Sequence, residues 1–156
     1  MADDLQRLKL HDMHVALGGR MVPFAGYEMP VHYAPGVMKE HLHTRQAAGV
    51  FDVSHMGQVI VRPKTGMVAL CLAFEQLMPV DVLGLAEGRQ RYGLFTSETG
   101  GILDDLMFAN HGDHLFVVVN AACKTADIAH MTAHLSAVAE VSAITDRALL
   151  ALQGPQ

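Results

Sequence analysis

The stretch TGGILDDLMF, residues Thr99–Phe108, predicts a turn that leads into a β-strand. Its two glycines relieve the steric limits on a chain that reverses direction, and an apolar run follows them. Two adjacent acids, Asp104 and Asp105, interrupt that run. Because successive side chains of a strand point to opposite faces, one acid must point inward or into a cleft if one face is covered. A carboxylate there is costly without a partner or a chemical role, although spacing alone favours a solvated acid beside a hairpin turn.

Composition indicates one domain of ordinary size. The chain has 156 residues, of which 51% are hydrophobic and 17% are charged. The charged fraction is below the usual share of about 25%, so we expect much buried surface or a large interface. The formal net charge is −5 and the basic residues form no polybasic run, which argues against a nucleic-acid partner.

The two cysteines, Cys71 and Cys123, lie in apolar or helical patterns without metal-ligand spacing, so we expect reduced thiols. Reduced thiols fit a cytoplasmic location. The N-terminal residues carry acids and lack a signal-peptide pattern, and the longest apolar run is far short of the roughly 20 residues of a membrane span, so we expect no membrane partner. The chain stops at Gln156 directly after an apolar run and a turn, and we expect the natural protein to continue.

Hydrophobic periodicity predicts four helices and a series of strands. The helices are expected at residues 5–17, 36–48, 64–77 and 121–137, and further strands at 58–61, 91–96, 114–120, 141–144 and 148–152. The strand at 114–120 is almost continuously apolar, which predicts burial on both faces. The segment 21–33 contains two prolines and a glycine, so we expect irregular backbone that either covers the core or forms the wall of a ligand pocket.

The order of elements from residue 51 predicts the fold class. Strand, helix, three strands, helix and strand follow one another, as in a split β-α-β or ferredoxin-like mixed sheet with helices packed on one face. We therefore expect an α+β fold. Residues 1–50 are predicted to supply helices and an apolar loop that wrap the core, and residues 51–156 the α+β portion, cut short at its C-terminus.

Several chemical classes lack their signatures. Asp52, Ser54 and His55 are the residue types of a catalytic triad, but closeness in sequence is not triad geometry and no nucleophile-elbow context surrounds them. A loop whose side chains bond the backbone is the preferred interpretation. The ten histidines are dispersed without metal-ligand spacing, so no metal is expected. Neither phosphate-binding glycine pattern occurs, which argues against a nucleotide enzyme.

Five stretches in this order and spacing resemble the N-terminal portion of the glycine cleavage system T protein, the aminomethyltransferase family. The FDVSHMG and GGILDD runs are the specific ones, and the resemblance covers essentially the whole chain. The five stretches are Met21–Pro30, Gly49–Gly57, Gly100–Leu106, Val118–Ala122 and Ala151–Pro155.

The resemblance implies an enzyme. Family members take an aminomethyl group from the lipoyl arm of the H protein. With tetrahydrofolate as cosubstrate, they release ammonia and form 5,10-methylene-tetrahydrofolate. The α+β portion would then belong to a larger multidomain folate-binding fold, with folate in a central channel.

The resemblance also implies site residues. Asp105 matches the family's key acid near the reacting nitrogens of folate, and Asp104 becomes its structural partner. A carboxylate in a partly apolar channel can stabilise positive charge and steer a proton, with its pKa tuned by burial. The expected folate-binding residues are Tyr92, Asp105, Met107, Asn120 and Met56. A family tyrosine two residues after Met107 is Ala109 here, so that contact differs.

Two other functions stay open. Relatives of this fold bind folate without aminomethyl transfer, although they usually diverge in the SHMG and GGxxDD stretches. Alternatively, the chain is a fragment that is inactive by itself, because residues that anchor the folate in the family lie beyond residue 156.

Overall fold

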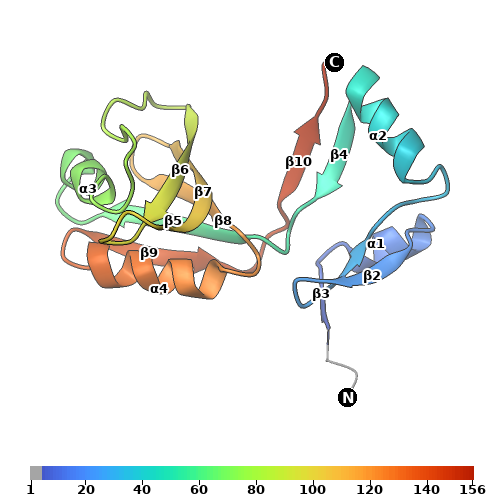
Figure 1. The fold of residues 1–156 in the computed structure, drawn as a ribbon, viewed down its shortest axis with the longest axis horizontal. Coiled ribbons are helices and arrows are strands. Elements are labelled where there is room, and N and C mark those ends of the chain that lie inside the picture. The colour runs from blue at the N-terminus through green and yellow to red at the C-terminus, as the bar shows by residue number, and fades with distance from the viewer. Residues whose placement is uncertain (1–4) are drawn as a thin grey trace. The chain divides into compact units, whose positions relative to one another are not determined.

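The computed structural model describes residues 5–156, and within them ten strands and four helices (Figure 1). Their contacts divide the chain into two compact units: residues 56–145, here called the sheet unit, and residues up to 55 with 146–156, here called the terminal unit. The sheet unit contains β5 (Gly57–Pro63), α3 (Met67–Phe74), β6 (Gln90–Thr96), β7 (Ile102–Asn110), β8 (Leu115–Val119), α4 (Lys124–Leu135) and β9 (Ala139–Ile144). The terminal unit contains β1 (Gln6–Arg7), α1 (His11–Ala16), β2 (Met21–Phe24), β3 (Tyr27–Pro30), α2 (Val37–Gln46), β4 (Gly49–Asp52) and β10 (Leu150–Gln153).

This division differs from the domain boundary expected after residue 50. Strand β10 pairs antiparallel with β4, with Leu150 opposite Asp52 and Gln153 opposite Gly49. Residues 146–156 therefore group with the N-terminal residues and not with the α+β portion. The sequence pattern predicts that each strand exists, but it carries no signal for a pairing between segments so far apart in the chain.

The sheet unit is built on five strands in the order β6-β7-β8-β5-β9. Strands β8 and β9, joined by helix α4, run parallel with β5 between them, which is the predicted split β-α-β arrangement. All neighbouring strands in this sheet are antiparallel, so the sheet itself is not mixed as expected. The reason is that each helix joins strands that are not neighbours, while hairpins join β6 to β7 and β7 to β8.

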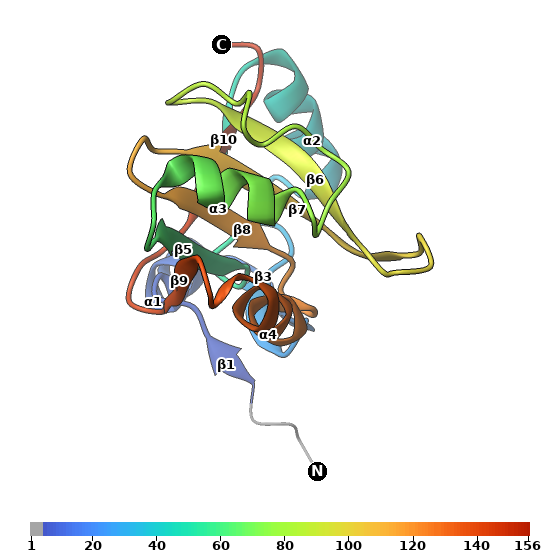
Figure 2. The same cartoon turned by 90° about the vertical axis from the view of Figure 1, so that its left-hand side faces the viewer.

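The hydrophobic core of the sheet unit lies between one face of this sheet and both helices, which cover the same side in Figure 2. Helix α3 contributes Leu70 and Phe74, and α4 contributes Met131 and Leu135. Phe74 packs edge-on against Phe95 and Phe108 of the strands. Burying each such side chain contributes about 1.5–3 kcal/mol, so this layer stabilises the sheet unit.

The opposite face of the sheet, here called the open face, is covered by neither helix of the sheet unit. Strand β8 shows this directly, because Leu115, Val117 and Val119 are buried while Phe116 and Val118 are only half-buried. The prediction that this strand is buried on both faces is therefore wrong. Its outward apolar residues mark a surface that the sheet unit leaves uncovered.

The turn before β7 confirms the role expected for its glycines. The Ser97 N–H donates to the Gly101 carbonyl at 2.8 Å, and the Ser97 hydroxyl accepts from the Gly101 N–H at 3.0 Å. Gly100 has a φ of +80°, which an L side chain rarely adopts. The strand that follows starts at Ile102 and sets the alternation that separates the two acids.

The terminal unit contains a hairpin where irregular backbone was expected. Strands β2 and β3 pair from Met21 opposite Pro30 to Phe24 opposite Tyr27. Ala25 and Gly26 form the two-residue loop, both with positive φ as a hairpin turn of this type requires. The prolines fit because β2 is an edge strand and Pro30 ends β3.

Within residues 5–156, no helix is long and apolar enough to span a bilayer.

Candidate functional site

Sheet register brings three of the predicted site residues to one end of the sheet unit. Val119 pairs with both Leu106 of β7 and Gly57 of β5. One position farther along, Asp105 lies before Leu106, Asn120 follows Val119, and Met56 precedes Gly57. The sequence places these residues far apart, and antiparallel pairing brings them together.

The next row of the sheet adds two more predicted residues. Tyr92 pairs with Met107, and Met107 pairs with Val118. Side chains two apart on a strand share a face, so Met107 and Asp105 lie on the same side as Tyr92. Tyr92 is 67% exposed, Asp105 is exposed and Met107 is half-buried. All three therefore belong to the open face.

Asn120 ties Asp105 to its surroundings. The side-chain nitrogen of Asn120 donates to Oδ1 of Asp105 at 3.1 Å and lies 3.0 Å from the Asp105 carbonyl oxygen. It also lies 3.1 Å from Oδ1 of Asp104. Hydrogen bonds to charged groups are stronger than neutral ones, so this amide restrains the Asp105 carboxylate without covering it.

Asp104 points to the helix-covered face, as strand alternation predicts. Its residue is half-buried, and its Oδ2 atom is buried with no hydrogen-bond donor among residues 5–156. Of the two acids, the inward one is therefore Asp104. Asp105 is exposed, so the partly apolar channel expected around it is not closed by the described residues of this unit.

A third acid lies in this corner, Asp127 of helix α4, which was not predicted from the sequence. It is only 4% exposed. Burial first, and then the hydrogen bond and the charge of Asp104, raise the pKa of Asp127 to about 7. The available signal was helical spacing, because Asp127 lies four and eight residues before the buried Met131 and Leu135.

Ala109 occupies the place of the family tyrosine. It is half-buried and pairs with Gln90 on one side and Phe116 on the other. Its register position is on the open face, two residues beyond Met107. An alanine here leaves more room beside Phe116 than a tyrosine would and offers no hydroxyl.

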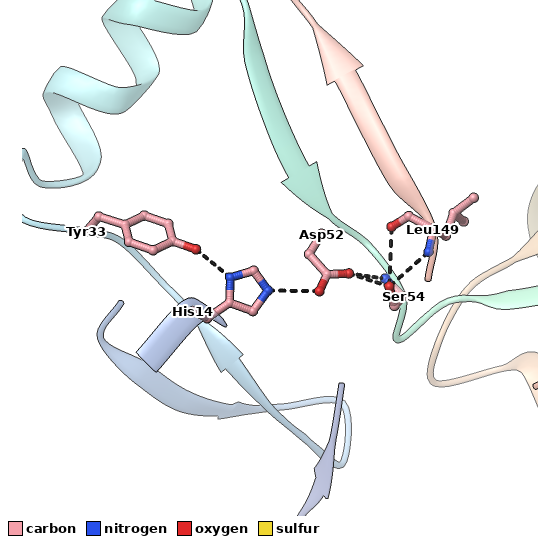
Figure 3. Close-up of polar contacts among 5 residues, drawn as sticks. All are labelled: His14, Tyr33, Asp52, Ser54 and Leu149. Carbon is pink, nitrogen blue, oxygen red and sulfur yellow. Dashed lines mark hydrogen bonds and ion pairs between the residues drawn. The ribbon is translucent and has the colours of Figure 1, made fainter. Parts of the chain in front are cut away.

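The terminal unit contains a separate buried polar network (Figure 3). The Tyr33 hydroxyl lies 2.6 Å from Nδ1 of His14, and Nε2 of His14 lies 2.8 Å from Oδ2 of Asp52. Because a carboxylate only accepts, Nε2 carries the proton, and Nδ1 of a neutral ring accepts from Tyr33. Ser54 donates its hydroxyl to Asp52 and accepts the Leu149 N–H at 2.9 Å.

The geometry of this network is that of a structural hydrogen-bond network and not of a catalytic triad. The histidine that meets Asp52 is His14 and not the neighbouring His55, and Ser54 bonds the carboxylate directly, so no base stands beside its hydroxyl in triad fashion. Burial alone would raise the pKa of Asp52, but the hydrogen bonds from His14 and Ser54 outweigh it and lower that pKa. The preferred interpretation of this loop, side chains that bond the backbone, is thus confirmed for Ser54.

Two other features concern ligands. Among the described residues, no three His, Cys, Asp or Glu side chains are placed to hold a metal ion. Cys71 and Cys123 are both free thiols, as expected. The charge of Asp104 is the first cause that raises the pKa of Cys123, which lies directly before helix α4.

Comparisons with known proteins agree on one family. Residues 10–156 match the model of the GCVT N-terminal domain. The mitochondrial aminomethyltransferase of Dictyostelium discoideum is 42% identical, over 99% of this chain and 39% of that protein. The aminomethyltransferase of Rubrobacter xylanophilus is 45% identical, over 97% of this chain and 40% of that protein.

A solved structure supports the same grouping. The crystal structure of the glycine cleavage system aminomethyltransferase T from Bartonella henselae superimposes with a TM-score of 0.88 at 39% identity, covering 98% of this chain and 42% of that one. The chain thus spans about two fifths of the length of the relatives it matches.

Proposed function

The chain belongs to the family of the GCVT N-terminal domain, and we propose that the protein containing it is a tetrahydrofolate-dependent aminomethyltransferase. It would move the aminomethyl group carried by the lipoylated H protein of the glycine cleavage system to tetrahydrofolate. Ammonia would be released and 5,10-methylene-tetrahydrofolate formed. The names of the matched relatives support the reaction class, and the folate cosubstrate is inferred from the family resemblance.

One observation carries the proposal for this chain's own residues. The exposed carboxylate of Asp105 is held by Asn120 at 3.1 Å beside a row of apolar and aromatic side chains on the open face. The pterin part of a folate is flat and carries N–H donors. Tyr92, 67% exposed, and Leu94, 40% exposed, offer surface against which such a ring can pack, and the carboxylate offers an acceptor. The residues present therefore fit a folate.

The proposed roles follow from residue chemistry. Tetrahydrofolate supplies the nucleophilic nitrogens when it is bound. Asp105 would accept a hydrogen bond or a proton and stabilise positive charge that develops as ammonia leaves. Asn120 would hold that carboxylate in place, while Tyr92, Met107 and Met56 would provide contact surface. Orientation of this kind supplies a large part of many enzymatic rate enhancements.

The partner and the compartment belong to the same proposal. The lipoylated H protein is proposed because the matched Bartonella henselae structure belongs to the glycine cleavage system by name. The expectations of no nucleic-acid partner and no membrane partner stay predictions from charge and hydropathy. The matched relatives include both mitochondrial and bacterial proteins, so the cytoplasmic location also stays a prediction.

A second candidate behaviour is a chain that cannot work alone. The span of about two fifths of its relatives favours this, because a folate channel built from several parts is incomplete in one of them. Folate binding without transfer is the related alternative. It predicts folate affinity in the full-length protein without ammonia release.

Two measurements test the proposal. Full-length protein is supplied with aminomethyl-loaded H protein and tetrahydrofolate, and ammonia release is followed; release that requires both supports the proposal, and folate binding without release contradicts it. Calorimetry of the 156-residue chain with a tetrahydrofolate analogue then asks where the pocket lies. Heat that is lost in Tyr92→Ala places the pocket on the open face, whereas no heat favours the inactive fragment.

A further inference from the structure

Two buried carboxyl groups in the sheet unit each have an unpaired oxygen. Oδ2 of Asp104 and Oδ2 of Asp127 are buried, and neither has a hydrogen-bond donor among residues 5–156. Asp127 is more than nine-tenths buried. A charged carboxylate in such a place is strongly disfavoured unless a proton or a donor satisfies it.

The fold brings these two groups together. Asp104 points toward the helix-covered face, and Asp127 faces the sheet from the first turn of α4. The two side chains interact, because a side-chain hydrogen bond with Asp104 and the charge of Asp104 both raise the pKa of Asp127. The approach is close because Gly57 has no side chain, and a Cβ there would lie 2.9 Å from Cβ of Lys124 at the start of α4.

A single proton satisfies both carboxyl groups. Two carboxylates offer only acceptors, whereas a protonated Asp127 is a donor to the carboxylate of Asp104. The pair then carries one negative charge and not two. Asn120 connects this pair to the open face, because its amide nitrogen lies 3.1 Å from Oδ1 of Asp104 and 3.1 Å from Oδ1 of Asp105.

We propose that Asp127 is a positioning residue for Asp105: its carboxyl proton is donated to Asp104, and the resulting Asp127–Asp104–Asn120 chain of hydrogen bonds fixes the Asp105 carboxylate on the open face. This inference deepens the proposed function, since it concerns the same carboxylate. Loss of the proton adds a third negative charge beside Asp104 and Asp105, whose Oδ1 atoms both lie 3.1 Å from the Asn120 amide nitrogen. Repulsion among them then loosens Asp105.

The titratable groups around Asp127 determine the pH at which its carboxyl group loses its proton. From β7, the charge of Asp104 on the same face and the charge of Asp105 on the other face both favour the neutral form of Asp127. Before α4, Cys123 is held in its thiol form by the same charges. On α4 itself, Lys124 lies one turn before Asp127, and His130, whose pKa burial lowers, packs against Phe95 one turn after it. The proton on Asp127 is therefore shed near pH 7, in the range where an enzyme works.

The test uses the full-length protein and two variants. Asp127→Asn keeps a donor, because its amide N–H reaches Asp104, but cannot lose a proton. Asp127→Ala removes the donor and leaves the Oδ2 of Asp104 unpaired. Carboxyl carbons of ¹³C-labelled aspartate and the side-chain amide of Asn120 are followed by NMR from about pH 5 to 9, and turnover is measured over the same range.

The expected result has three parts. In the unsubstituted protein a carboxyl titrates near pH 7, and the Asn120 amide signal shifts with it. Asp127→Asn abolishes that titration and keeps turnover within about 3-fold, with the fall above neutral pH removed. Asp127→Ala lowers kcat about 10- to 100-fold with KM little changed, the size expected for a misplaced reacting group.

Other results overturn the inference. A titration near pH 7 that survives in Asp127→Asn assigns the proton elsewhere, and an Asn120 signal identical in Asp127→Ala and the unsubstituted protein shows no coupling. Because the NMR readout needs no activity, the inference stands or falls separately from the proposed function. A protein that titrates as predicted but releases no ammonia contradicts the function alone.

Discussion

The side-chain nitrogen of Asn120 lies 3.1 Å from Oδ1 of Asp105 and 3.0 Å from its carbonyl oxygen. One amide thus restrains both the backbone and the carboxylate of the same residue. Asn120 follows the end of β8, and Asp105 lies within β7, so the restraint depends on the register between these two strands. The central carboxylate of the site is therefore held by the sheet and not by a flexible loop.

Asn120→Asp is predicted to lower turnover about 100-fold in the full-length protein. The change preserves shape, but it removes the donor and adds a carboxylate next to Asp104 and Asp105. The magnitude is that of losing one well-placed hydrogen bond to a reacting charge. Initial rates of ammonia release measure it.

The matched control is Asn110→Asp. Asn110 also donates its side-chain amide, to the Leu85 carbonyl at 2.8 Å, at the far end of the same strand as Asp105. Loss of this hydrogen bond should lower the free energy of unfolding by about 1 kcal/mol, while kcat stays near that of the unsubstituted protein. Equal losses of kcat in the two variants would show that the effect of Asn120 is general and not specific to Asp105.

Gly57→Ala is predicted to destabilise the sheet unit by about 1–3 kcal/mol, the usual cost of overpacking. A Cβ at this position would lie 2.6 Å from Cγ2 of Val119 and 2.9 Å from Cβ of Lys124. Helix α4 must then move away from the sheet and carry Asp127 with it. Urea unfolding followed by circular dichroism measures the change.

Gly101→Ala serves as the comparison. Its nearest neighbour would be the flexible Ser97 hydroxyl at 3.2 Å, so the change should cost clearly less. The close approach of α4 to the sheet is disproved if Gly57→Ala proves as stable as Gly101→Ala.

Asp52 is predicted to make stability fall in acid. The pKa of this carboxyl is lowered in the folded state below its ordinary value, so the ionised carboxylate contributes stability above that ordinary value. That contribution is lost as the pH falls through the lower folded-state pKa. In the Asp52→Asn variant the urea midpoint should therefore change less with pH between about pH 5 and 2 than in the unsubstituted protein.

The control for this prediction is Asp12→Asn on helix α1, whose carboxyl is fully exposed. Its curve should follow that of the unsubstituted protein. His14→Ala should lower stability by about 3 kcal/mol at neutral pH, because it leaves a buried charge without its partner. If the urea midpoint of Asp52→Asn falls with pH as steeply as that of Asp12→Asn, Asp52 does not cause the loss of stability in acid.

Much of the site follows from local rules. Strand alternation alone separates Asp104 from Asp105, and a turn signal before an apolar strand places β7. Periodicity also locates three of the helices to within three residues at each end. The helix expected at 5–17 is shorter, because residues 6–7 form strand β1 and α1 begins only at His11. The family resemblance then assigns the chemical role to Asp105 and the supporting role to Asp104, but which acid points inward comes from the structure.

Other features depend on contacts that no local pattern encodes. His14 meets Asp52, which lies 38 positions away in the sequence, and β10 pairs with β4 across the whole sheet unit. The hairpin at 21–30 was missed because Pro23 is acceptable only on an edge strand, and edge position is a property of the assembled sheet. Asp127 was missed because an acid on an apolar helix face has no meaning until its partner Asp104 is known.

The most direct test of the central claim is the Asp105→Asn variant of the full-length protein. The change keeps the shape of the side chain and an oxygen that can accept the hydrogen bond from Asn120, but it removes the charge. Ammonia release with aminomethyl-loaded H protein should fall about 100-fold or more, while the Kd for a tetrahydrofolate analogue rises much less. Glu98→Gln, an exposed acid in the turn before β7, should behave as the unsubstituted protein. Turnover of Asp105→Asn close to that of the unsubstituted protein would contradict the role of Asp105.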